Sequence, residues 1–221
     1  IPLLCYRHFP EAEMKNKLER YQRQIILKGF GQEAQEALFN AKVLVIGAGG
    51  LGCPVLQYLT AAGVGFIGIV DDDVVSISNL HRQVLFDTND IGKQKVKVAA
   101  VKLRVMNPDV TIEEYKIQLN KSNCLAIVED YNIIVDCTDN FSSRYLINDA
   151  CVLKGKPLVF AAVNRFEGQV AVFNANEKGK SPSCNYRDLF PQQPAQSEVM
   201  NCAEAGVLGV LPGIIGSMQA N

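Results

Sequence analysis

The sequence predicts an α/β protein built on a doubly wound, mostly parallel sheet of the Rossmann-like type, with antiparallel strands toward the C-terminal half. Compact β-branched runs alternate with helical patterns, as in βαβ units. A glycine-rich loop, Gly47–Gly52, separates the first such run from a helix. Two later apolar runs, 158–163 and 169–173, are joined by a short turn, which indicates an antiparallel pair. With 221 residues and no linker or internal repeat, we expect a single domain over residues 1–221.

The N-terminal part carries two helical patterns. Residues 11–27 are charged, with Tyr21, Ile25 and Ile26 on one side, and a second, shorter helix is expected over 32–40. The run 42–46 is then compact and β-branched, which is typical of a strand buried on both faces.

The glycine loop leads into a predicted helix over 54–62. Pro54 stands in the first turn, where its missing N–H costs little. The second strand is expected over 66–70. It is followed by three consecutive aspartates, Asp71 to Asp73.

A helix is expected over 91–106, because small and aliphatic residues share one of its sides and Asn107-Pro108 stops it. Residues 110–115 alternate as a strand does, and a short helix follows over 123–129. The next apolar run, 133–137, predicts another buried strand.

The C-terminal third begins with a predicted helix over 141–154 and the antiparallel pair. Residues 174–197 are polar and contain three prolines, so we expect a long loop of functional importance or high mobility. The apolar run 205–218 is too short, and too interrupted by Pro212 and glycines, to span a bilayer. Since an apolar pattern is still running at Asn221, we expect further residues beyond it.

The composition excludes several classes of protein. A net charge of -1 does not favour binding to nucleic acid, and neither a signal peptide nor a membrane segment is visible. None of the seven cysteines forms a C-x-x-C pair, which indicates reduced thiols rather than a disulfide framework. We expect a soluble, cytoplasmic protein.

The glycine loop, Gly47-Ala48-Gly49-Gly50-Leu51-Gly52, fits the pattern G-x-G-x-x-G between a strand and a helix. Gly47, Gly49 and Gly52 allow backbone N–H groups to approach a phosphate at the start of the helix. Asp71, at the end of the next strand, stands where a ribose hydroxyl is bound. The loop predicts a nucleotide without separating NAD from ATP, and a tight strand–helix crossing is the purely structural alternative.

Two cations follow the aspartates. Asn79 and Arg82 are three residues apart and share a face of a helical turn, and Lys95 follows near the start of the next helix. Arginine and lysine at these positions could neutralise charge on phosphate oxygens during transfer at an α-phosphate. The alternative is a basic helix face exposed to solvent.

A polar segment, Asp136-Cys137-Thr138-Asp139-Asn140, follows the strand 133–137. The carboxylate of Asp139 at this edge of the sheet could hold Mg²⁺ that bridges phosphates. The alternative is that Asp139 or Asn140 caps the following helix.

Seven short segments, spread from about Arg20 to Gln219, occur in an order that is far more specific than the glycine loop alone. They are Arg20-Tyr21-Gln22-Arg23-Gln24, the loop with Cys53, Ser78-Asn79-Leu80-His81-Arg82-Gln83, Gly92-Lys93-Gln94-Lys95, Asp136-Cys137-Thr138-Asp139-Asn140, Glu167-Gly168-Gln169 and Cys202-Ala203-Glu204-Ala205-Gly206. With these segments the chain resembles the MoeB/ThiF/HesA family, the bacterial relatives of ubiquitin-activating enzymes.

The resemblance implies an adenylyltransferase that uses ATP and Mg²⁺. Its substrate would be the C-terminal Gly-Gly carboxylate of a small β-grasp sulfur carrier of the ThiS or MoaD type, in thiamine or molybdopterin biosynthesis, with release of pyrophosphate. The residues implied are Gly50 in the phosphate loop, Asp71 on the ribose with Asp73 also in the nucleotide site, Asn79, Arg82 and Lys95 on the phosphates, Asp139 on Mg²⁺, and Arg23, which in a homodimer reaches the ATP of the partner subunit.

Two cysteines mark where the resemblance is incomplete or open. Many family members hold a structural zinc with two C-x-x-C pairs, but Cys184 stands alone here, so we expect no zinc. Cys202 matches a cysteine that takes part in sulfur transfer in thiamine-type members. A thiol kept for packing is the alternative for Cys202, and packing is the expected role of Cys53.

Three other functions remain open. An NAD-dependent oxidoreductase explains the glycine loop and Asp71 but leaves Arg82, Lys95 and Asp139 without a task. A nucleotide-binding protein without catalysis is a second alternative. Family members that act on tRNA or on a peptide share the same site residues, so only the substrate separates them.

Overall fold

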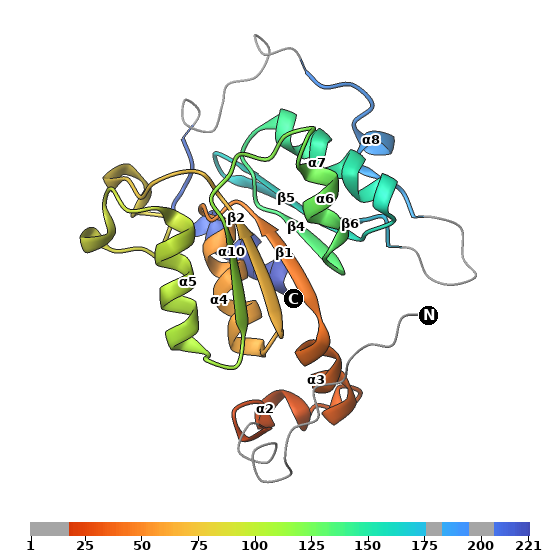
Figure 1. The fold of residues 1–221 in the computed structure, drawn as a ribbon. Helices are drawn as coiled ribbons and strands as arrows, with labels where there is room; N and C mark the ends of the chain where they lie inside the picture. The colour runs from red at the N-terminus through yellow and green to blue at the C-terminus, as the bar shows by residue number, and fades with distance from the viewer. Residues whose placement is uncertain (1–17, 176–182, 195–205) are drawn as a thin grey trace.

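The computed structural model describes residues 18–175, 183–194 and 206–221 (Figure 1). These residues form a six-stranded sheet in the order β3-β2-β1-β4-β5-β6, in which only β6 runs antiparallel to its neighbour. The strands are β1 (Lys42–Ile46), β2 (Phe66–Val70), β3 (Thr111–Tyr115), β4 (Ile133–Asp136), β5 (Leu158–Asn164) and β6 (Glu167–Phe173). The prediction of a doubly wound, mostly parallel sheet with antiparallel strands toward the C-terminal half is confirmed.

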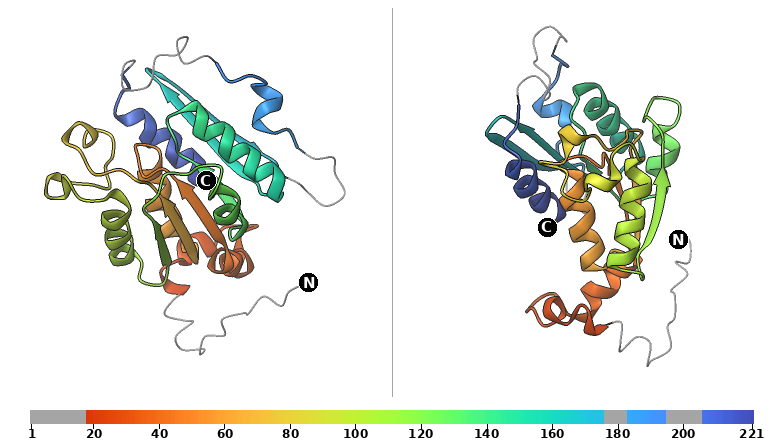
Figure 2. Two further views of the ribbon diagram at one scale, coloured as in Figure 1. Left: turned by 45° about the horizontal axis from the view of Figure 1, so that its top comes forward. Right: turned by 90° about the vertical axis from the view of Figure 1, so that its left-hand side faces the viewer.

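Helices cover both faces of the sheet (Figure 2). They are α4 (Gly52–Ala62), α5 (Lys95–Met106), α6 (Cys124–Glu129), α7 (Phe141–Lys154) and α10 (Val210–Ala220), whereas α3 (Gly31–Asn40) lies at the end of the sheet where β1 begins. Because side chains alternate along a strand, Val43 and Val45 of β1 pack toward α4 and α5, whereas Leu44 and Ile46 pack toward α6 and α7. The two clusters are the cores of the two layers.

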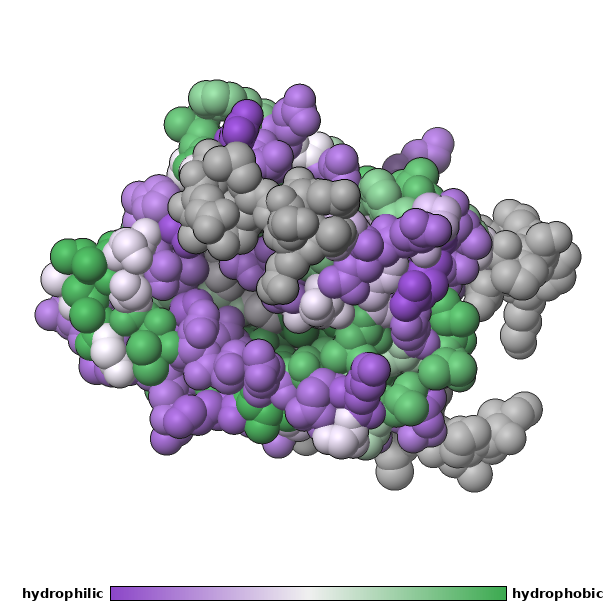
Figure 3. Space-filling view, turned by 90° about the horizontal axis from the view of Figure 1, so that it is seen from above, coloured by the Kyte–Doolittle hydropathy of each residue, from purple (hydrophilic) through white to green (hydrophobic). Residues whose placement is uncertain are grey.

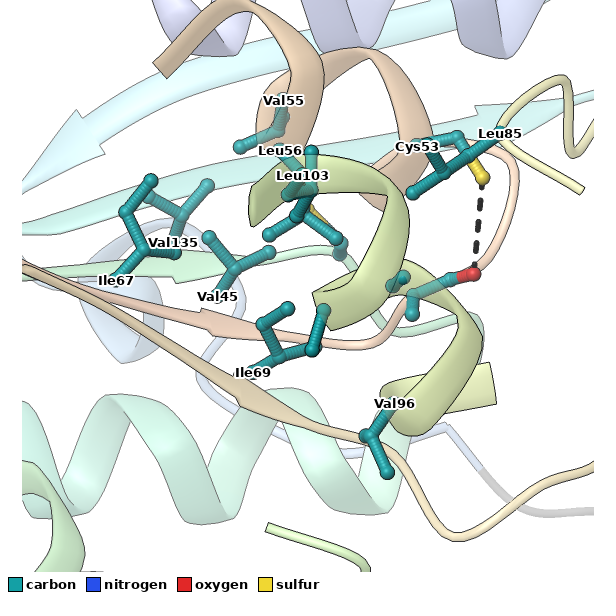
Figure 4. Close-up of a cluster of buried hydrophobic side chains, with 14 of the residues drawn as sticks. Val45, Cys53, Val55, Leu56, Ile67, Ile69, Leu85, Val96, Leu103 and Val135 are labelled. Atoms are coloured by element: carbon teal, nitrogen blue, oxygen red, sulfur yellow. Dashed lines mark hydrogen bonds between the residues drawn. The ribbon is translucent and has the colours of Figure 1, made fainter. Parts of the chain in front are cut away.

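The first of these clusters lies behind the glycine loop. Val45, Ile67 and Ile69 of the sheet point toward Val55, Leu56 and Leu103 of the helices (Figure 4). The Cys53 thiol lies 3.8 Å from the carbonyl oxygen of Ala48, and burial raises its pKa to about 12. The expectation that Cys53 serves packing is therefore consistent with its surroundings.

Two elements differ from the prediction by more than two residues at a boundary. Helix α5 begins at Lys95 rather than at residue 91, because Gly92 has a φ of 81° and Gln94 is extended and forms a β-bridge with Val74. At the N-terminus, the described part of the expected helix 11–27 is interrupted: residues 18–19 are helical, a turn follows, and α2 covers Gln22–Ile25. Residues 11–17 of that expectation lie outside the described residues.

Tyr21 is buried, as its place on the apolar side of the expected helix predicts, and its hydroxyl accepts a hydrogen bond of 2.7 Å from Asn107 Nδ2. Ile26 is 65% exposed, so its assignment to the same side was wrong. The chain turns at Ile26, where the helix ends.

Two helices were not predicted. The long loop contains the four-residue helix α8 (Tyr186–Leu189), and the apolar C-terminal segment forms α10 in spite of its proline and glycines. Pro212 occupies the third position of α10, where an N–H has no partner within the helix. Within the described ranges, no helix combines the length and the apolar character needed to cross a bilayer.

Candidate nucleotide-binding site

A cavity of about 550 Å³ opens at the carboxyl ends of the parallel strands. Residues that follow β1, β2, β3 and β4 line it, so it lies across the point where the strand order reverses between β1 and β4. Seen from this end, hydrophobic residues occupy the middle of the surface and hydrophilic residues surround them (Figure 3). The size and the position of the cavity suit a nucleotide.

The glycines of the loop divide into two pairs. A Cβ on Gly47 would lie 2.7 Å from the Cys137 carbonyl oxygen, and one on Gly52 would lie 1.9 Å from the Gly47 carbonyl oxygen, so these two are required for packing. Gly49 and Gly50 line the cavity, and so does Gly47. A Cβ on Gly49 would meet only Gln83, at 3.7 Å, an ordinary contact. Packing therefore does not explain Gly49, and its open backbone fits the close approach of a phosphate to the start of α4.

Asp71 is fixed beside the loop. Its Oδ2 accepts a hydrogen bond of 2.7 Å from the Ala48 N–H, and its Oδ1 accepts one of 2.9 Å from the Asp73 N–H. Burial raises the pKa of this carboxyl, and Lys95 opposes the rise. The carboxylate lines the cavity at the position that binds ribose hydroxyls in this class of sheet.

The two predicted cations, Lys95 and Arg82, both line the cavity but are held by different partners. Lys95 is 4% exposed, and its Nζ lies 2.7 Å from Oδ2 of Asp73. Nη1 of Arg82 donates a 3.0 Å hydrogen bond to the carbonyl oxygen of Ser78. Both side chains line the cavity.

Asn79 supports Arg82 rather than lining the cavity. Its carbonyl oxygen accepts hydrogen bonds from the N–H groups of Arg82, at 3.0 Å, and Gln83, at 2.9 Å. This turn follows the 3₁₀ helix η1 (Ile77–Asn79). A phosphate contact from the side chain of Asn79 stays a prediction.

The turn after β4 contains a helix cap and also places a carboxylate at the cavity; binding of Mg²⁺ by that carboxylate stays a prediction. Asn140 caps α7 by accepting a 2.9 Å hydrogen bond from the Ser143 N–H, while Asp139 lines the cavity. Oδ1 of the buried Asp136 shapes the turn by accepting from the N–H and the hydroxyl of Thr138, at 2.9 and 2.7 Å. A carboxylate among hydroxyl and amide oxygens is the kind of donor set that Mg²⁺ uses.

A second set of oxygens lies after β2, where the carboxylates of Asp71, Asp72 and Asp73 approach within 4.8 Å of one another. Asp71 is already engaged with the loop backbone, and Asp73 pairs with Lys95. The arrangement holds the loop and the lysine in place, and we keep Asp139 as the expected ligand of the metal.

Two other predicted positions are not in this cavity, and a third lies outside the described residues. Arg23 lies on α2, which Figure 1 shows beyond the opposite end of the sheet. Cys184 is exposed, and Cys202 lies outside the described residues. The expectations for zinc and for a reactive Cys202 stay predictions.

The cavity also contains residues that the sequence did not single out. Ile117 and Leu119 follow β3 and give it an apolar wall next to β2, which suits a nucleotide base. The sequence could have indicated these two residues, because residues that directly follow a parallel strand lie at the cavity end of the sheet. Arg144, one turn into α7, also lines the cavity, but it does not directly follow a strand, so its position in the sequence did not indicate this.

The sequence matches the model of the ThiF family over residues 21–221. It is 54% identical over 93% of its length to the "Sulfur carrier protein adenylyltransferase" of Thermus thermophilus, of which it covers 76%. It is 52% identical over 91% of its length to "Adenylyltransferase and sulfurtransferase MOCS3" of Xenopus laevis, and 46% identical over 94% to "Probable adenylyltransferase/sulfurtransferase MoeZ" of Mycobacterium tuberculosis. The chain spans only 44% and 53% of these last two proteins.

Solved structures share the fold. The structure titled "Crystal Structure of SeMet PaaA" superimposes with a TM-score of 0.70 at 23% identity, over 97% of this chain and 67% of that one. The structure "TcdA (CsdL)" gives a TM-score of 0.62 at 23% identity, over 70% of this chain and 60% of that one.

Proposed function

The chain belongs to the ThiF family and is an adenylyltransferase, and from this premise we propose that it uses ATP and Mg²⁺ to adenylate the C-terminal Gly-Gly carboxylate of a small, ubiquitin-like sulfur carrier. The relatives named for adenylyl transfer, one of them for a sulfur carrier, support the substrate class. More specifically, we propose that the carrier is of the ThiS or MoaD type and serves thiamine or molybdopterin biosynthesis.

The reaction requires little covalent chemistry from the protein. A carboxylate oxygen of the carrier attacks the α-phosphorus, the bond from that phosphorus to the bridging oxygen breaks, and pyrophosphate leaves with the electron pair. The product is an acyl-adenylate. Positioning and stabilisation of charge on the phosphate oxygens supply the catalysis.

The observation that carries the proposal is the pair of cations at one nucleotide cavity. Arg82 and Lys95 line the cavity from the β2 side, close to the glycine loop, and Asp139 lines it from the β4 side. Hydride transfer would leave this arrangement without a purpose, whereas displacement at an α-phosphate needs charge compensation around the phosphates. In this scheme Asp71 holds the ribose and Asp139 holds Mg²⁺.

The proposal includes a homodimer. Arg23 is exposed at the end of the sheet opposite the cavity, so within one chain it is poorly placed to act there. An arginine supplied by the partner subunit would complete the charge around the γ-phosphate.

The test is ATP–pyrophosphate exchange with Mg²⁺, with and without a carrier that ends in Gly-Gly. We expect exchange that depends on the carrier, and comparison of ThiS- and MoaD-type carriers then names the pathway. A carrier truncated by its last two glycines is the matched control. Tight ATP binding without exchange, for every carrier, would contradict the proposed substrate, and binding of NAD instead of ATP would contradict the assignment of the cations.

A further inference from the structure

Arg144 is a buried arginine on the wall of the cavity. The residue is 7% exposed, yet it lines the cavity together with Thr138 and Asn140. Burying a guanidinium is costly unless its charge and its donors are compensated. The groups that compensate the charge and the donors of Arg144 must therefore be identified.

The aromatic side chains around Arg144 fix its place. The guanidinium carbon lies 5.2 Å from the ring centre of Phe141 and 5.6 Å from that of Phe160. Contacts of this kind hold a cation over a ring face. They leave the edge of the guanidinium, where its N–H donors lie, to other partners.

Those donors are poorly satisfied. Nη2 reaches the carbonyl oxygen of Thr138 at 3.4 Å, a long hydrogen bond, and Nε is buried without an acceptor among the described residues. Arg144 also approaches Tyr186, where it opposes the rise that burial causes in the pKa of that phenol. Arg144 also interacts electrostatically with the buried carboxyl of Asp136, but no carboxylate of the described residues forms an ion pair with it.

The position of Arg144 separates it from the phosphate-binding cations. Lys95 and Arg82 lie on the β2 side of the glycine loop, whereas Arg144 follows β4, on the other side of β1. The apolar wall after β3, suited to a base, lines the opposite side of the cavity from Arg144. The β4 and β5 side, which Val163 also lines, is the side left for a second substrate.

From this geometry we propose that Arg144 binds the C-terminal carboxylate of the acceptor chain, an inference that rests on the proposed function. The two oxygens of a carboxylate match the fork of guanidinium donors. Arg144 would hold the carboxylate in the cavity before attack on the α-phosphorus. It is thus a substrate-binding residue, distinct from the cations that compensate the phosphates.

The test is a binding cycle on the whole chain with Mg²⁺ and a non-hydrolysable ATP analogue. The probes are a Gly-Gly-ending carrier with a free carboxylate and the same carrier ending in a carboxamide. We expect the wild type to bind the carboxylate form about 10- to 100-fold more tightly, as for a charged hydrogen bond. The Arg144→Gln variant should lose this discrimination and keep its affinity for the ATP analogue.

Two further variants make the result decisive. Arg104→Gln changes an arginine on α5 that pairs with Glu114 away from the cavity, and it should behave as the wild type does. Arg144→Lys keeps the charge, should retain part of the discrimination, and serves if Arg144→Gln does not fold.

The inference is overturned if Arg144→Gln still discriminates between the two carriers. A loss of affinity for the ATP analogue with discrimination intact would assign Arg144 to the phosphates instead. Failure of the proposed function is a separate result, because it would appear as absence of carrier-dependent exchange in the wild type.

Discussion

The side chain of Arg82 donates a hydrogen bond to the carbonyl oxygen of Ser78 and lines the cavity. We predict that Arg82→Ala lowers carrier-dependent pyrophosphate exchange by roughly 10²-fold or more, as for loss of one transition-state donor. The melting temperature should change little, because the residue is only partly buried. Exchange and thermal unfolding measure the two effects.

Arg104→Ala is the control for that experiment, since Arg104 is an exposed arginine that pairs with Glu114 outside the cavity. Turnover of Arg82→Ala equal to that of Arg104→Ala would remove Arg82 from the charge-compensating role.

Several residues that the sequence predicts for the nucleotide site line one cavity, and their signals in the sequence are local. Gly49 and Asp71 are recognisable from their positions directly after strands β1 and β2. Arg144 could not be recognised in this way. Its burial depends on Phe160 and Tyr186, which come from other elements, so its environment exists only in the folded chain.

At the scale of elements, the boundaries that were predicted correctly are those set by compact apolar runs, such as β1 and β2. Helix α10 was missed because glycine and proline lower helix propensity. Tertiary packing overrides that propensity here: Pro212 and Gly216 are buried, and Gly216 lies against the Leu51 carbonyl and Pro54. Helix propensities of single residues take no account of such a tertiary contact.

The two glycines inside α10 should respond in opposite ways to alanine. A Cβ on Gly213 meets nothing within 4 Å, so Gly213→Ala should stabilise the protein by about 0.5–1 kcal/mol through helix propensity. A Cβ on Gly216 would lie 2.4 Å from the Leu51 carbonyl oxygen. Gly216→Ala should therefore destabilise by about 1–3 kcal/mol, as overpacking does.

Urea unfolding of both variants measures these free energies. The pair is its own control, because the same change is made in the same helix. Equal effects at the two positions would mean that α10 does not pack on α4 as described.

A charged cluster joins the second half of α5 to the 3₁₀ helix η2 (Thr88–Asp90). Lys102 lies 2.7 Å from Asp87 and also pairs with Asp90. The hydrogen bond from Lys102 lowers the pKa of Asp87 below 3.8. Burial raises the pKa of Asp90, but the hydrogen bonds from Lys102 and the Asp87 N–H, together with the charges of Lys102 and Lys93, outweigh it, and the net shift is also downward.

Because these folded-state pKa values are lowered, the stabilisation is present above the unfolded value and is lost as the pH falls through the folded value. We predict that the wild type loses stability between about pH 5 and pH 2 more steeply than Lys102→Met does. Thermal melts across this range, with Lys97→Met as an exposed-lysine control on α5, measure the difference. Parallel pH profiles for the wild type and Lys102→Met would contradict the assignment.

At the scale of the whole molecule, the positions of Arg23 and the cavity at opposite ends of the sheet lead to a prediction about assembly. If the partner subunit supplies Arg23, then Arg23→Ala and Asp139→Ala chains should each be nearly inactive as pure proteins. Co-expressed with different tags and purified through both, they should form a hybrid dimer. One site of that dimer contains an intact cavity together with an intact Arg23.

The hybrid should recover about half of the wild-type exchange activity per dimer, because one of its two symmetric sites is complete. A tandem-purified dimer of two Asp139→Ala chains is the matched control and should stay inactive. A hybrid as inactive as its parents would show that Arg23 does not act across the subunit boundary. An active Arg23→Ala protein on its own would show that the cavity needs no arginine beyond those of its own chain.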